Sequence, residues 1–152
     1  MGITQFDMNA RSLRIVMVND EPRVLKTFEV VISRWFKDVT ILSFENGAAA
    51  LEELLKTDPD LLITDERMPV MSGPELCQRL FDKQVTYPII VDSAWEPREQ
   101  TEQWVREFAN RGLNVSYLPV PCDVETILRA VETALKIQRL EVENPQEKMD
   151  YR

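Results

Sequence analysis

Short apolar runs alternate with amphipathic helical patterns from Arg14 to Ile137, and this alternation constrains the fold more than any other feature. The runs are rich in β-branched residues and have the length of strands that are buried on both faces. They cover residues 15–19, 40–44, 61–64, 88–91 and 115–118. Strands separated by helices pair in parallel through right-handed crossovers. The sequence therefore predicts an α/β fold, a doubly wound (βα)5 three-layer sandwich.

The helical patterns suggest how the chain is divided. The first begins at Pro22, a residue favoured at helix starts, and the last begins near Asp123. The last pattern can extend to Glu143, and such a helix would be a dimer element, the start of a link to another domain, or a frayed surface helix. We expect an N-terminal extension over 1–12, one domain over 13–140, and a polar tail or the start of a linker over 141–152.

The composition excludes several classes of function. With no histidine among 152 residues, the chain has no Ser-His-Asp or Cys-His catalytic group, no histidine-based zinc site and no phosphohistidine of its own. A net charge of −8 argues against direct binding of nucleic acid, because phosphates are neutralised by clustered Lys and Arg. We find no apolar run of the ~20 residues that cross a bilayer and no signal-peptide pattern, so a cytoplasmic location without membrane contact is expected.

Acidic residues follow two of the predicted strands directly. Asp65 ends the run over 61–64, and Asn19-Asp20-Glu21 ends the run over 15–18. A parallel sheet places its ligand site outside the carboxyl ends of its strands. Two strands that deliver carboxylates to one edge form the arrangement that a divalent cation or a phosphoryl group needs.

Further motifs occur in a fixed order along the chain. They lie at residues 19–22, 45–47, 59–65, 68–73, 88–94 and 117–121, and include Asn-Asp-Glu-Pro, Thr-Asp and Met-Pro-Val-Met-Ser-Gly. Together they resemble the response regulator receiver domain of two-component signalling, from Arg14 to about Leu140. The resemblance implies a flavodoxin-like sheet with the strand order 2-1-3-4-5.

The resemblance also implies roles for individual residues. Asp65 would be the phosphoacceptor, served by a histidine kinase or a phosphotransfer protein. Mg²⁺ would be the cofactor, held by Asp20, Asp65 and the backbone carbonyl of Arg67. Ser93 would donate a hydrogen bond to the phosphoryl group, and Tyr117 would be the aromatic switch residue. Each role also has a simpler structural interpretation: Asp65 as a capping acid at a strand-to-loop turn, Asp20 as a helix N-terminal acid, Ser93 as an ordinary loop hydroxyl, and Tyr117 as a half-buried core aromatic.

Two departures from the family pattern concern the site itself. The family has two adjacent acids before Glu-Pro, and here the first is Asn19, which the resemblance would place just behind the metal ligands. The family has a lysine before the proline that follows the fifth strand, and here that position is Val120. The resemblance implies a cis peptide between Val120 and Pro121. Asp92 and Trp95 are further unusual residues next to Ser93.

These observations leave two hypotheses. The first is a phosphoryl-accepting switch, not an enzyme, that signals through the face formed by the fourth helix, the fifth strand and the fifth helix, where a homodimer could also form. The second is a pseudo-receiver, a protein-interaction module that works without phosphorylation. Asp20, Asp65 and Ser93 favour the first hypothesis, whereas Asn19, Val120, Asp92 and Pro119 favour the second.

Overall fold

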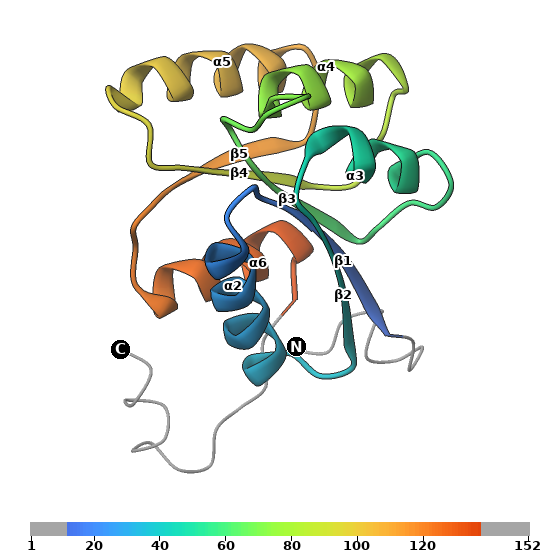
Figure 1. The fold of residues 1–152 in the computed structure, drawn as a ribbon, viewed down its shortest axis with the longest axis vertical. Helices are drawn as coiled ribbons and strands as arrows, with labels where there is room; N and C mark the ends of the chain where they lie inside the picture. Colours follow the sequence, from blue (N-terminus) through green and yellow to red (C-terminus); the bar gives the residue numbers. More distant parts are fainter. Residues whose placement is uncertain (1–11, 138–152) are drawn as a thin grey trace.

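The structure, a computed structural model, describes residues 12–137 and contains one parallel sheet of five strands (Figure 1). The strands are β1 (Leu13–Val18), β2 (Val39–Phe44), β3 (Leu61–Asp65), β4 (Ile89–Ser93) and β5 (Val115–Pro119). Their order is β2-β1-β3-β4-β5, and every neighbouring pair is parallel. The predicted fold class and strand order are therefore confirmed.

Helices cover both faces of the sheet (Figure 1). One face carries α2 (Pro22–Trp35) and α6 (Val124–Leu135), and the other carries α3 (Gly47–Leu54), α4 (Gly73–Asp82) and α5 (Arg98–Asn110). Successive residues of β1 serve different cores: Ile15 packs with the residues of α2 and α6, and Val16 with those of α3, α4 and α5. This double burial explains why the central strands are continuous apolar runs.

The start of α4 fixes the loop that follows β3. Ser72 and Glu75 form a reciprocal capping box: the Glu75 amide donates to Ser72 Oγ at 3.3 Å, and the Ser72 amide donates to Glu75 Oε1 at 2.9 Å. The Gly73 amide donates to the carbonyl oxygen of Glu66 at 2.8 Å. The loop after Asp65 is thus held at both ends.

The end of the last helix differs from one sequence prediction. α6 ends at Leu135, and Lys136 has a left-handed φ of 56°, so a continuous helix to Glu143 is wrong. A left-handed residue at this position ends a helix by redirecting the chain. The proposed boundaries at residues 12 and 140 fall at or beyond the limits of the described region, and the extension over 1–11 and the tail over 141–152 lie outside it.

Across residues 12–137, none of the helices has the length and apolar character that a membrane span requires.

Candidate functional site

A cavity of about 660 Å³ opens at the carboxyl edge of the sheet and brings most of the predicted site residues together. It is lined by residues at or just beyond the carboxyl ends of β1, β3, β4 and β5, and by residues of α2 and α6. Among them are Asn19, Asp20, Asp65, Arg67, Ser93 and Val120. Asp20 and Asp65 therefore share one cavity, as expected for acids at the ends of two parallel strands.

Asp65 is half-buried, and its carboxylate lies in acidic surroundings. The Glu66 amide donates to Asp65 Oδ1 at 2.7 Å. The pKa of Asp65 is raised to about 6: burial is the main cause, the Glu66 amide contact opposes it, and the negative charges of Asp20, Glu21 and Glu66 add smaller increases. A cation placed among these carboxylates would favour the ionised form of Asp65.

The donor set fits Mg²⁺, which takes oxygen ligands and needs only one or two carboxylates. Asp20 and Asp65 supply two, and water or backbone oxygens can complete the shell. Within residues 12–137, no group of three or more His, Cys, Asp or Glu side chains is arranged to hold a metal ion.

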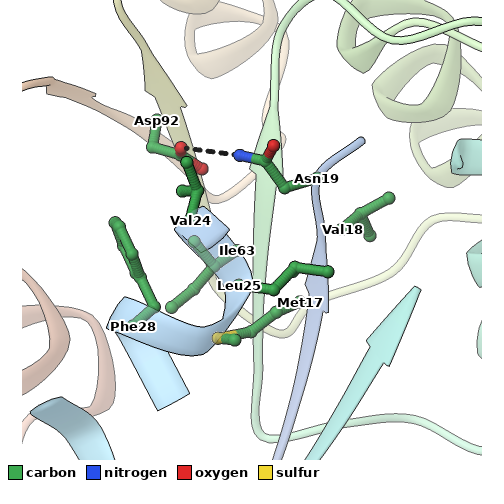
Figure 2. Close-up of a pocket in the computed structure, with 8 residues that line it drawn as sticks. All are labelled: Met17, Val18, Asn19, Val24, Leu25, Phe28, Ile63 and Asp92. Atoms are coloured by element: carbon green, nitrogen blue, oxygen red, sulfur yellow. Dashed lines mark hydrogen bonds between the residues drawn. The ribbon is translucent and has the colours of Figure 1, made fainter. Parts of the chain in front are cut away.

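Asn19 is engaged by protein groups (Figure 2). Its Oδ1 accepts from the Glu21 amide at 2.9 Å, which leaves its Nδ2 facing Asp92 Oδ2 at 3.5 Å. Asp92 is only 3% exposed, and its pKa lies well above the usual range, first because it is buried and second because Asp65 is close. A carboxyl group that favours its neutral form does not replace the charge that Asn19 lacks.

The position of the family's lysine lies on an apolar wall of the cavity. Val120 is half-buried and packs against the core under α2 and α6, and its peptide bond to Pro121 is cis, as the resemblance implied. Arg67, which lines the cavity, and Arg98, the first residue of α5, each contact another side chain. The Arg67 guanidinium lies over the Trp95 ring, with 3.2 Å between Cζ and the ring centroid, and Arg98 pairs with Glu96 at 3.6 Å.

Tyr117 lies outside this cavity, on the face of the sheet that carries α5. It is half-buried and packs with the core that contains Val105 and Phe108. Its hydroxyl is buried and has no hydrogen-bond partner within the described part of the chain, and burial raises its pKa. The structure thus leaves both interpretations of Tyr117 open.

Sequence reasoning missed a polar cluster beside Asp65, which we call the Glu66 cluster: Glu66, Ser93, Thr101 and Trp104. Three side chains donate to the Glu66 carboxylate at 2.6 Å: Ser93 Oγ and Thr101 Oγ1 to Oε1, and Trp104 Nε1 to Oε2. Glu66 is 6% exposed. The only signal in the sequence was an acid placed directly after a buried strand.

Comparison with known proteins identifies the class of protein to which this fold, with its cavity at the carboxyl edge of the sheet, belongs. Residues 15–132 match the sequence model of the response regulator receiver domain. The chain belongs to the response regulator receiver family, whose members take part in two-component signalling and pair with histidine kinases or phosphotransfer proteins.

Relatives and solved structures agree with this assignment. The chain is 32% identical over 97 residues to the DNA-binding transcriptional regulator NtrC of Escherichia coli, covering 64% of this chain and 20% of NtrC. It is 30% identical over 133 residues to the response regulator MprA of Mycobacterium ulcerans, covering 86% of this chain and 53% of MprA. The receiver domain of NarL from Mycobacterium tuberculosis matches the fold, with a TM-score of 0.69 and 24% identity over 83% of this chain and 98% of that one.

Proposed function

We propose that this receiver domain accepts a phosphoryl group on Asp65 and passes the signal on through α5, β5 and α6. The observation that supports this most directly is the shared cavity, in which Asp20, Asp65 and Ser93 meet. The donor would be a histidine kinase or a phosphotransfer protein, as in the family. The domain itself would extend over residues 13–140.

Phosphoryl transfer requires the protein mainly to position the reacting groups and to stabilise their charge. An Asp65 carboxylate oxygen attacks the phosphorus atom of the donor, a P–O bond forms, and the P–N bond of the donor phosphohistidine breaks. The leaving imidazole keeps the bonding electron pair and takes a proton from solvent. The Glu66 amide holds Asp65 Oδ1 in place at 2.7 Å, so that the other oxygen is available for attack.

Asp20, Asp65 and the Arg67 backbone carbonyl would hold Mg²⁺. When bound, the ion neutralises charge on the phosphoryl oxygens and on the attacking carboxylate. The acidic surroundings of Asp65 support this assignment, because the charges of Asp20, Glu21 and Glu66 act on it and position 120 carries no lysine.

Replacing Asn19 with aspartate should tighten Mg²⁺ binding about tenfold, since one added charge near a divalent ion contributes ~1–2 kcal/mol even in a water-like dielectric. Titration calorimetry at pH 7.5 would measure this. Asn114→Asp is the matched control, because it makes the same chemical change in an exposed residue just before β5, at the other edge of the sheet. Equal affinities for the Asn19→Asp protein and the wild type would show that the charge count does not govern binding.

A second candidate function is the pseudo-receiver, a protein-interaction module that works without phosphate. Two observations favour it: Val120 presents an apolar side chain where the family has a lysine, and Ser93 already donates to Glu66. On this hypothesis, partner binding by the α5, β5 and α6 face, including a homodimer, would be independent of Asp65.

Intact-mass spectrometry after incubation with acetyl phosphate and Mg²⁺ distinguishes the two candidate functions. The wild type should gain about 80 Da, the mass of one phosphoryl group in the adduct that Asp65 forms by nucleophilic attack. Asp65→Asn should gain nothing, because its amide is not a nucleophile toward phosphorus. A wild type without adduct, together with partner binding that survives Asp65→Asn, would establish the pseudo-receiver instead.

A further inference from the structure

The Glu66 carboxylate lies between the phosphoacceptor and helix α5. Glu66 follows Asp65 in the chain, yet its side chain is buried and accepts from Ser93 on β4 and from Thr101 and Trp104 on α5. All three contacts measure 2.6 Å. Contacts this short are typical of bonds in which one partner is charged, and these bonds are stronger than neutral ones.

The contact with Ser93 uses the only proton of that hydroxyl. A serine hydroxyl is one donor and two acceptors. Ser93 Oγ donates to Glu66 Oε1 at 2.6 Å and accepts from the Trp95 amide at 3.0 Å. In this arrangement Ser93 has no proton left to donate to a phosphoryl oxygen on Asp65.

The same carboxylate holds α5. Thr101 and Trp104 are three residues apart on that helix and so lie on one face of it. Thr101 is fully buried. If Ser93 turned away from Glu66, Thr101 would be the one side chain of residues 12–137 that still donates to Oε1. The contacts that hold α5 against the loop after β3 would then change.

We propose that Glu66 is a positioning residue that competes with the phosphoryl group for the Ser93 proton and thereby restrains both phosphorylation of Asp65 and movement of α5. The proposal rests on the function proposed above. It involves only an exchange of hydrogen bonds: Ser93 leaves Glu66 Oε1 and donates to an oxygen of the new aspartyl phosphate. In the resting protein the Glu66 cluster keeps Ser93 and α5 together.

Glu66→Gln tests the competition with little change in shape. A glutamine can keep its carbonyl oxygen toward Trp104 Nε1 and turn its amide group toward Ser93 and Thr101. The amide then donates to the Ser93 oxygen, and the Ser93 proton becomes free. We expect Glu66→Gln to accelerate adduct formation from acetyl phosphate and Mg²⁺ about tenfold, which corresponds to about 1.4 kcal/mol.

Ser93→Ala separates competition for the proton from a general effect of charge. If Glu66 acts through Ser93, Glu66→Gln should accelerate the reaction less than about threefold in a Ser93→Ala background, whatever the rate of Ser93→Ala itself. Glu21→Gln is the charge control. Glu21 is exposed, and its charge also acts on Asp65. Glu21→Gln should therefore change the rate of adduct formation by the same factor whether position 93 is serine or alanine.

The Trp104 indole gives a readout that does not depend on rates. Its N–H signal in a ¹H–¹⁵N spectrum, assigned with Trp104→Phe, should shift in Glu66→Gln. It should also shift in the wild type when the aspartyl phosphate forms, because the carboxylate that it contacts loses a donor.

The possible results are distinguishable. A tenfold gain that needs Ser93, with a shift of the Trp104 signal on phosphorylation, supports the proposal, as does an adduct that appears only in Glu66→Gln. An unchanged rate, or an equal gain with and without Ser93, overturns the proposal and leaves the phosphoacceptor function intact. No adduct in any variant overturns the phosphoacceptor function itself, and the role of Glu66 with it.

Discussion

Val120→Lys is expected to accelerate phosphorylation of Asp65 by acetyl phosphate about 100-fold. Val120 lines the same cavity as Asp65, so a lysine there can extend along the apolar wall and place its ammonium group near the phosphoryl oxygens. Removal of one group that stabilises developing charge commonly costs ~10²–10³ in rate, and we expect its addition to recover a similar factor. The time course of the 80 Da adduct in intact-mass spectra measures the change.

Val120→Met is the matched control for this experiment. Methionine also removes the valine and is about as long as lysine, but it carries no charge. The control should react at the rate of the wild type. If methionine accelerates the reaction as much as lysine, relief of crowding explains the effect; if neither does, the missing lysine does not limit the reaction.

The position of Arg67 gives a further reason to expect that Val120→Lys has a large effect on the rate. Arg67 is the cation that follows the phosphoacceptor most closely in the chain, but its guanidinium is stacked on Trp95 at 3.2 Å. A cation over an aromatic face is stabilised there, and moving it costs that contact. Lysine at 120 would add a positive charge to the same cavity without breaking the Arg67–Trp95 pair.

Much of the fold could be predicted from the sequence because the deciding signals are local. The run over 61–64 is apolar apart from Thr64 and is followed by Asp65, and the structure places it in β3 at the centre of the sheet. The end of α6 could not be predicted in the same way. Apolar residues continue at helical spacing to Ile137, but the left-handed backbone of Lys136 interrupts the helix, and a pattern of side chains does not report a single backbone angle.

In the candidate site, too, some features follow from local sequence signals and others depend on how distant elements pack. The meeting of Asp20 and Asp65 follows from strand order alone, since both lie at carboxyl ends of adjacent parallel strands. The Glu66 contacts join residues 27, 35 and 38 positions apart, and they depend on how α5 packs beside the β3 loop. No spacing along the chain encodes that packing, so the sequence predicts that Ser93 serves the phosphoryl group, while in the structure its proton is held by Glu66.

Gly73→Ala is expected to destabilise the fold by about 2 kcal/mol, in the range of overpacked sites. A Cβ at position 73 would lie 2.5 Å from the carbonyl oxygen of Asp65 and 3.0 Å from the Cα of Glu66. Both are backbone atoms, so no side chain can turn away to relieve the contact. Urea unfolding monitored by tryptophan fluorescence measures the loss.

The same substitution should also slow phosphorylation at least tenfold, because the displaced backbone carries Asp65 and Glu66 themselves, and small misplacements of reacting groups are costly. Gly112→Ala is the control: Gly112 has a φ of 110° and nothing within 4 Å of the position that an added Cβ would take, so alanine strains the backbone there and destabilises the fold far from the site. Loss of stability in both variants, with slow phosphorylation only in Gly73→Ala, would show that the close approach of α4 holds the phosphoacceptor in place. A Gly73→Ala protein as stable and as reactive as the wild type would instead mean that the loop after β3 yields freely, and that Asp65 is positioned by its strand alone.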